Sequence, residues 1–89
     1  METAMATTEE LNETIDVVTV FHQGRMAPVK FRWAGRTHPV TRVAYRWVTR
    51  QGAYPVHHFS VVTPDDQLCE IALNTQNMQW SLLKVQMEG

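Results

Sequence analysis

The chain has 89 residues, a formal net charge of −1 and a hydrophobic fraction of 44%, which is enough for one small domain with a single core. It holds one cysteine, so a secreted scaffold held by intrachain disulfides is excluded. No stretch approaches the roughly 20 apolar residues of a membrane-spanning helix, and the N-terminus lacks the pattern of a signal peptide. We therefore expect a soluble, cytoplasmic protein that does not act in a membrane.

The charges fall in blocks along the chain. Residues 1–16 carry five acids and no base, whereas residues 17–64 carry seven bases and no acid. The start of the chain is polar, and a capping-box pattern begins at Thr7. This predicts an acidic tail over residues 1–14, either flexible or as a short helix, followed by one domain over residues 15–89.

Beyond the tail, apolar and polar side chains alternate with a period of two, which is typical of β-strands. Turn-forming Gly, Pro, Asn and Asp residues separate the alternating segments. We expect strands at residues 15–22, 28–33, 37–50, 55–63, 68–74 and 78–85. The pattern predicts an all-β domain, a small antiparallel barrel of five or six strands or a bent meander of the SH3 or OB kind.

The loop at residues 34–36 decides which residues share a face of the sheet. If all three belong to the loop, Phe31 pairs with Pro39, and the aromatic faces of both strands join in one core. A two-residue loop would instead pair Phe31 with His38 and turn Arg42 and Arg46 inward. Because burying unpaired guanidinium groups costs several kcal/mol each, we expect the three-residue register or a bulge equivalent to it.

In this register the bases of two strands share the outer face of the sheet, while Val43, Tyr45 and Trp47 lie in the core. The expected outer basic patch consists of Lys30, Arg32, His38, Arg42, Arg46 and Arg50. Arg36, in the loop, is a further candidate, either contacting a phosphate or capping the carbonyls of the hairpin. Cationic side chains spaced along an accessible surface are what a phosphate backbone requires.

The sequence therefore favours nucleic-acid binding through Lys30, Arg32, Arg36, Arg42, Arg46 and Arg50. In the alternative interpretation this face is only solvated, and the domain is a protein-interaction adaptor or a homo-oligomer that uses an open strand edge. A further hypothesis is that the acidic tail folds over the basic face and competes with an anionic partner.

The sequence does not favour an enzyme. The carboxylates form no evident pair of acid and base. His57 and His58 are neighbours in a strand and point to opposite faces, so they do not bind one metal ion. Cys69 has the same parity as Ile71 and is expected to be a small buried hydrophobe. We expect no catalytic residues, no metal and no cofactor.

Three motifs occur together between residues 28 and 86: Trp33-Ala-Gly-Arg36 in a hairpin, Val40-x-x-Val43 before Arg46-Trp47, and Trp80-Ser-Leu-Leu-Lys-Val85 in a closing strand. In these motifs the chain resembles an uncharacterised bacterial family of small β-domains. Members are stand-alone proteins or are joined or adjacent to Y-family DNA polymerases. The resemblance implies a small β-fold and a DNA polymerase as a candidate partner, and it assigns no activity.

Overall fold

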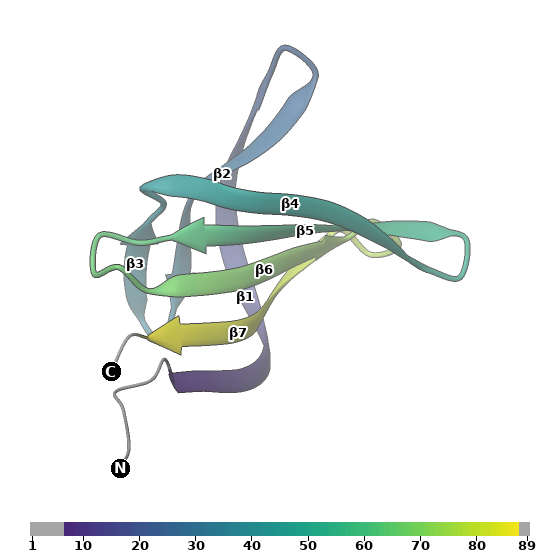
Figure 1. The fold of residues 1–89 in the computed structure, drawn as a ribbon. Coiled ribbons are helices and arrows are strands. Elements are labelled where there is room, and N and C mark those ends of the chain that lie inside the picture. Colours follow the sequence, from purple (N-terminus) through teal and green to yellow (C-terminus); the bar gives the residue numbers. More distant parts are fainter. Residues whose placement is uncertain (1–6, 88–89) are drawn as a thin grey trace.

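The computed structural model of the protein describes residues 7–87 and the side chains of residues 9–86. It contains seven strands: β1 (Thr7–His22), β2 (Arg25–Trp33), β3 (Arg36–Pro39), β4 (Arg42–Gln51), β5 (Tyr54–Val62), β6 (Leu68–Asn74) and β7 (Gln79–Met87). They form one antiparallel sheet in the order β3-β2-β1-β7-β6-β5-β4, which curls into a half-barrel (Figure 1). Within the described residues, no helix is long and apolar enough to cross a membrane.

The all-β class is confirmed, with more strands than the five or six expected. The acidic segment also differs from the expected tail or helix. Residues 1–6 lie outside the described residues, but residues 7–14 form the first half of β1 and pair with β7. Pairing with β7 satisfies the backbone of this segment, which a one- or two-turn helix in water does less well. Residues 7–16 therefore belong to the sheet, where Glu9, Glu10 and Glu13 pair along β7 and Asp16 pairs with Arg32 of β2.

The hairpin between β2 and β3 has a two-residue loop, so the expected three-residue register is wrong. Phe31 pairs with His38, and Ala34 and Gly35 have positive φ angles of 55° and 75°. This is the conformation of a tight two-residue hairpin turn, whose twist matches that of the strands. His38 consequently lies on the core side and not on the outer face, and its ring stacks on Phe31 with centroids 5.2 Å apart.

The expected cost of this register, buried arginines, does not arise because residues 37–50 are not one strand. Val40 and Thr41 separate β3 from β4. The Val40 N–H donates to the Val29 carbonyl of β2 at 2.8 Å, and the Thr41 N–H donates to the Val62 carbonyl of β5 at 2.7 Å. The chain thus crosses from one edge of the curled sheet to the other, and the alternation of side chains starts anew in β4.

A β-bulge at Ala44 then reverses the alternation inside β4. Val43 pairs with Val61, but the next pair along the ladder joins Tyr45 to Ser60. One residue of β4 therefore has no counterpart on β5, which shifts every later side chain of β4 to the opposite face.

The bulge overturns the expected burial of two aromatic residues. Arg46 pairs with the buried Phe59 and shares its face, whereas we expected it on the outer face. Tyr45 and Trp47, expected in the core, lie on the outer face and are 70% and 39% exposed.

The core fills the concave side of the half-barrel and draws on five strands. Phe31, Ile71, Leu82 and Val61 have at most 1% of their surface exposed. The buried cluster consists of Ile15, Phe31, Phe59, Val61, Cys69, Ile71, Leu82 and Val85. Trp33 packs at its margin, where its Nε1 donates to Glu13 Oε1 at 3.2 Å. A small core of this kind is sensitive to single methylene groups.

We expect Ile71→Val to lower the free energy of unfolding by about 0.5–1.5 kcal/mol, because it removes a methyl group from a site with no exposed surface. Urea denaturation followed by tryptophan fluorescence measures the change. The control is Val18→Thr at a position 50% exposed, which we expect to stay within about 0.5 kcal/mol. Equal effects of the two substitutions would contradict the described core.

Candidate functional site

Two hairpins extend from the curled body of the sheet as arms. The β1–β2 arm comprises residues 18–29, and the β4–β5 arm comprises residues 44–57. The two point in different directions (Figure 1), which contributes to principal extents of 47 × 26 × 26 Å. Both arms fall within residues 17–64, the stretch that contains no Asp or Glu. The block pattern of charge in the sequence therefore becomes a separation of charge in space.

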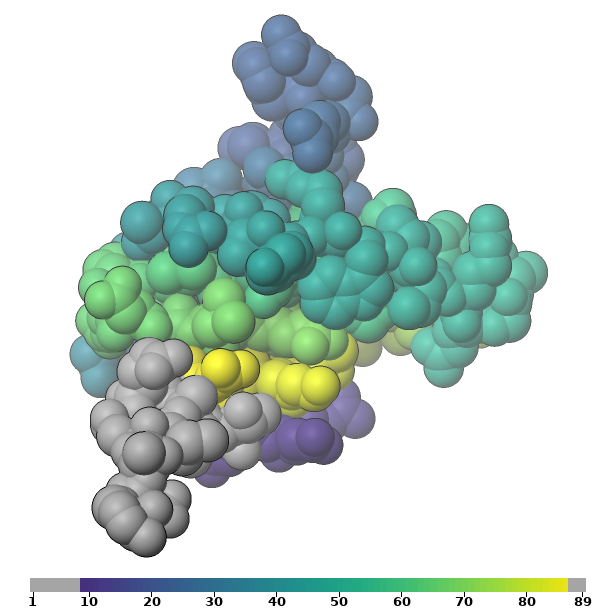
Figure 2. Space-filling model, viewed as in Figure 1, coloured from purple at the N-terminus to yellow at the C-terminus, as the bar shows by residue number. Residues whose placement is uncertain are grey.

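A cleft of about 450 Å³ lies between the arms. Figure 2 shows the tip of the β1–β2 arm standing apart from the β4–β5 arm. The cleft has apolar walls with a few cationic groups, and its lining includes Phe21, Arg25, Met26, Arg46, Trp47, Val48, His57, His58 and Phe59. None of the described residues that line it is acidic. A volume of this size is in the range of sites that hold a small organic group.

The walls of the cleft are open strand edges. As far as residues 7–87 show, β4 pairs with β5 alone, and β3 covers β2 only along residues 30–33. Arg25 and Met26 of β2 and residues 46–48 of β4 therefore line the cleft without forming a ladder with each other. Open edges offer backbone N–H and C=O groups to a ligand.

Arg46 is the side chain that ties the two edges together. Its Nη1 donates to the Met26 carbonyl of β2 at 2.8 Å, and its guanidinium lies 5.5 Å from the centre of the Phe59 ring. It thus contributes a cation–π contact and a charge-assisted hydrogen bond across the cleft. Arg46 is therefore a structural clasp, by which we mean that it bridges the two edges. Because the residue is exposed, it also presents positive charge to the cleft.

The outer face of β4 carries an aromatic platform, which we define as Tyr45 and Trp47. The Trp47 ring stacks on His58 of β5 with centroids 5.1 Å apart and planes inclined by 9°. The stack holds the indole against the surface of the sheet, and 39% of the residue stays exposed. Tyr45, two residues earlier on the same face, is 70% exposed.

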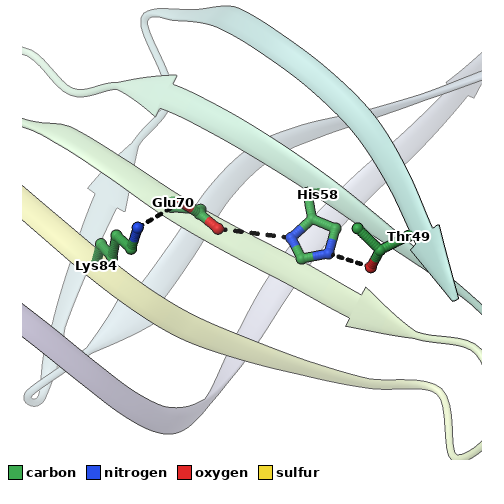
Figure 3. A network of polar contacts seen from close by, with 4 residues as sticks. All are labelled: Thr49, His58, Glu70 and Lys84. Carbon is green, nitrogen blue, oxygen red and sulfur yellow. Dashed lines mark hydrogen bonds and ion pairs between the residues drawn. The ribbon is translucent and has the colours of Figure 1, made fainter. Parts of the chain in front are cut away.

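A chain of polar contacts includes His58, the stacking partner of Trp47 (Figure 3). Thr49 Oγ1 lies 2.8 Å from His58 Nε2. On the other side of the ring, His58 Nδ1 lies 3.6 Å from Glu70 Oε2, and Lys84 Nζ lies 4.0 Å from Glu70 Oε1. Four adjacent strands, β4 to β7, each contribute one residue, so the chain of contacts ties the platform strand to the body of the sheet.

The order hydroxyl, imidazole, carboxylate resembles the relay of a hydrolase, but this geometry suits a structural role better. The His58 to Glu70 separation exceeds that of a hydrogen bond. Nucleophilic catalysis also needs donors aimed at a developing oxyanion. The amide of Asn74, which lies in the same hollow as Thr49, already donates to Gln51 Oε1 at 3.0 Å.

Three of the predicted binding residues lie on β2 and β3. Lys30 and Arg32 are exposed on either side of the buried Phe31, on the outer face as expected. Arg32 pairs with Asp16 of β1, so an opposite charge lies beside it. Arg36 is the first residue of β3, at the end far from β4.

The other three, Arg42, Arg46 and Arg50, are exposed along β4. The structure therefore does not assemble the six predicted residues into one patch, because β2 and β4 form opposite walls of the cleft. Arg50 Nη1 lies near the Ala53 carbonyl at 3.4 Å, within its own hairpin.

Sequence reasoning missed the exposed aromatic residues. Phe21 is 74% exposed at the end of the β1–β2 arm. The sequence did indicate this exposure, because Phe21 lies two residues before the turn at Gln23. A side chain at the end of a hairpin has few neighbouring residues to pack against. The exposure of Tyr45 and Trp47 depends on the bulge at Ala44, for which the local sequence contains no turn or glycine signal.

Comparison of the chain with protein-family models, curated proteins and solved structures finds no match. The functional argument consequently rests on the arms, the cleft and the aromatic platform.

We expect Arg46→Met to lower the free energy of unfolding by about 1 kcal/mol, because the Met26 carbonyl loses a hydrogen-bond donor while the apolar stem is kept. Urea denaturation measures the change. Arg42→Met, on the same strand, is the control, and we expect it to stay within about 0.5 kcal/mol. If the two variants are equally stable, Arg46 does not clasp the cleft.

Cys69 is buried, as expected, with 1% of its surface exposed. Burial raises the pKa of its thiol from 9.0 to about 11, because the thiolate would lose its hydration. A nucleophilic cysteine needs the opposite shift, so Cys69 acts as a core hydrophobe.

The raised pKa has a consequence for stability. The stabilisation from the neutral Cys69 thiol is fully present below pH 9.0 and is lost as the pH rises toward about 11. We therefore expect wild type to lose stability relative to Cys69→Ala over this range in urea denaturation. We also expect iodoacetamide to alkylate Cys69 slowly in native protein and readily in urea. Equal alkylation rates in the two states would show that the thiol is accessible.

Proposed function

We propose that this protein binds single-stranded nucleic acid along β4, with the aromatic platform stacking on bases and the arginines of β4 contacting phosphates. The observation that carries the proposal is the exposure of Tyr45 and Trp47 on a strand that bears three arginines and no acid. Single-strand binding combines a cationic track for the backbone with aromatic faces for the bases. β4 supplies both.

The spacing of the arginines suits an extended backbone. The ladder partners of Arg42 and Arg46 on β5 are three residues apart because of the bulge, and those of Arg46 and Arg50 are four residues apart, which corresponds to roughly 10 Å and 13 Å along a strand. Arg42 lies on the same face of β4 as the platform, whereas Arg46 and, against our expectation, Arg50 lie on the opposite face. All three are exposed on a strand that forms an open edge of the sheet. A nucleic-acid strand that follows this edge has arginines on both sides of it while its bases lie over the platform.

A single strand fits this surface better than a duplex does. Bases within a duplex are stacked on one another and present only their edges, so Tyr45 and Trp47 have no base face to contact. The hollow beside the platform is lined by amide and hydroxyl groups, which include Asn12, Thr49 and Ser81. Such groups form hydrogen bonds with the edges of unstacked bases.

Strand addition by a protein partner or a second copy is the competing use of the β4 edge, and the structure supports it less. The bulge at Ala44 interrupts the ladder near the start of β4, and the arginines place like charges along its edge. Both features are devices that discourage edge pairing. Two copies paired through β4 would bring arginines together. On the family resemblance alone, we propose a DNA polymerase as a protein partner at another surface.

We expect Tyr45→Ala to weaken binding of a labelled 10-nucleotide DNA strand by about 1–3 kcal/mol, the usual contribution of one stacked base. Fluorescence anisotropy at low salt measures it. Val20→Ala, on the outer face of the other arm and 46% exposed, is the control and should leave affinity unchanged. Undetectable binding of the wild type to DNA and RNA strands at low salt would refute the proposal.

The phosphate contacts predict a second, independent signature. Three contacts give a slope of log K against log salt of about −2 for a single strand. Arg42→Ala should lower the magnitude of that slope by about 0.7, whereas Arg36→Ala, outside β4, should not change it. The same slope in both variants would remove Arg42 from the interface.

A further inference from the structure

The cleft between the arms borders β4 and adjoins the aromatic platform, because its lining includes Trp47 as well as Arg46 and Val48. We propose that it receives one unstacked nucleobase of the strand bound along β4, next to the bases that lie over the platform. This inference rests on the proposed function, and it adds a second, base-selective site that the platform does not provide.

The charge of the cleft favours a group that belongs to an anion. Arg25 and Arg46 come from opposite arms, and no described residue of the lining is acidic. Arg46 already lies on the boundary between the cleft and the phosphate track of β4. A strand held by the arginines of β4 therefore reaches the cleft without crossing a region of negative charge.

The walls of the cleft match the flat apolar faces and polar edges of a base. Phe21 and Met26 on one arm, and Val48 and Phe59 on the other, provide apolar contact. Phe21 is 74% exposed, so its ring is accessible for stacking, which every base permits. Its pair in the hairpin, Met26, is a flexible, polarisable neighbour that adapts to an aromatic face.

The open edges of the cleft supply hydrogen bonds for the rim of the base. Arg25 and Met26 of β2 and residues 46–48 of β4 line the cleft, and within residues 7–87 these two strands form no ladder with each other. His57 adds a ring nitrogen on the β4–β5 arm. Because backbone positions are fixed by the two hairpins, these groups discriminate between bases by pattern, which stacking alone does not do.

An extended peptide is a less suitable occupant. Pro28 removes a donor from the edge of β2, and the bulge at Ala44 disturbs the edge of β4. In addition, Arg46 crosses the cleft to reach the Met26 carbonyl, in the path that a continuous added strand would take. A single base requires only the space on one side of this bridge.

The test compares two 10-nucleotide DNA strands with the same number of phosphates, one intact and one in which every base is replaced by an abasic site. We expect Phe21→Ala to weaken binding of the intact strand about tenfold and to leave the abasic strand unaffected, because the lost contact is with a base. Val20→Ala is the matched control, because Val20 is the preceding residue of β1 and lies on the opposite face. Both positions are exposed, and circular dichroism confirms the folding of each variant.

A second measurement replaces one base at a time by 2-aminopurine, whose fluorescence reports its stacking. We expect one position to respond to Phe21→Ala and another to respond to Tyr45→Ala. An effect of Phe21→Ala that is the same for intact and abasic strands, or is absent from both, would overturn the inference. So would an acidic peptide such as oligoglutamate that displaces the strand in wild type but not in Phe21→Ala.

The outcomes separate this inference from the proposed function. If the wild-type protein binds the intact strand and Tyr45→Ala weakens it while Phe21→Ala does not, the cleft inference is wrong and binding along β4 stands. If the wild-type protein binds neither strand at low salt, both are wrong.

Discussion

One additional residue in β4 decides what this protein presents to its surroundings. Because side chains in a strand alternate between faces, the bulge at Ala44 turns Tyr45 and Trp47 outward and brings Arg46 to the side of Phe59. Without it, the aromatic pair would be buried against the core and the arginine would be solvated outside. The candidate site on the outer face and the clasp inside the cleft are two results of the same shift in register.

The second constraint is the crossing at Val40 and Thr41, which joins the two edges of the sheet at one end and leaves them apart at the other. Backbone hydrogen bonds to Val29 and Val62 close the half-barrel there, and from that point β2 and β4 diverge into arms bridged by Arg46. A fully closed barrel would satisfy these edges with each other and leave no cleft. The incomplete ladder thus creates the space and the unpaired backbone groups that a ligand can use.

Rigid support on one side of β4 and an open cleft on the other give this strand its proposed role. The contacts from Thr49 through His58 and Glu70 to Lys84 tie the platform to three further strands, which holds the indole in place before any ligand arrives. The acidic residues of β1 lie in a different part of the sheet, paired with β7 and β2. A ligand that binds along β4 therefore contacts positive charge and aromatic surface together, away from most of the negative charge.

The sequence by itself determined the fold class, most of the turns and the burial of Cys69, because alternation and turn chemistry are local properties. The segment 68–74, for example, is a strand with the predicted bounds. The sequence also determined the separation of charge, since two hairpins lie wholly inside a stretch without acids. Only the tertiary structure decided the faces. His38 turned inward because the hairpin favoured a two-residue turn, and Tyr45 and Trp47 turned outward because of a bulge. Both orientations depend on how strands that are distant in the sequence pair across the sheet. A local pattern with a period of two does not predict that pairing.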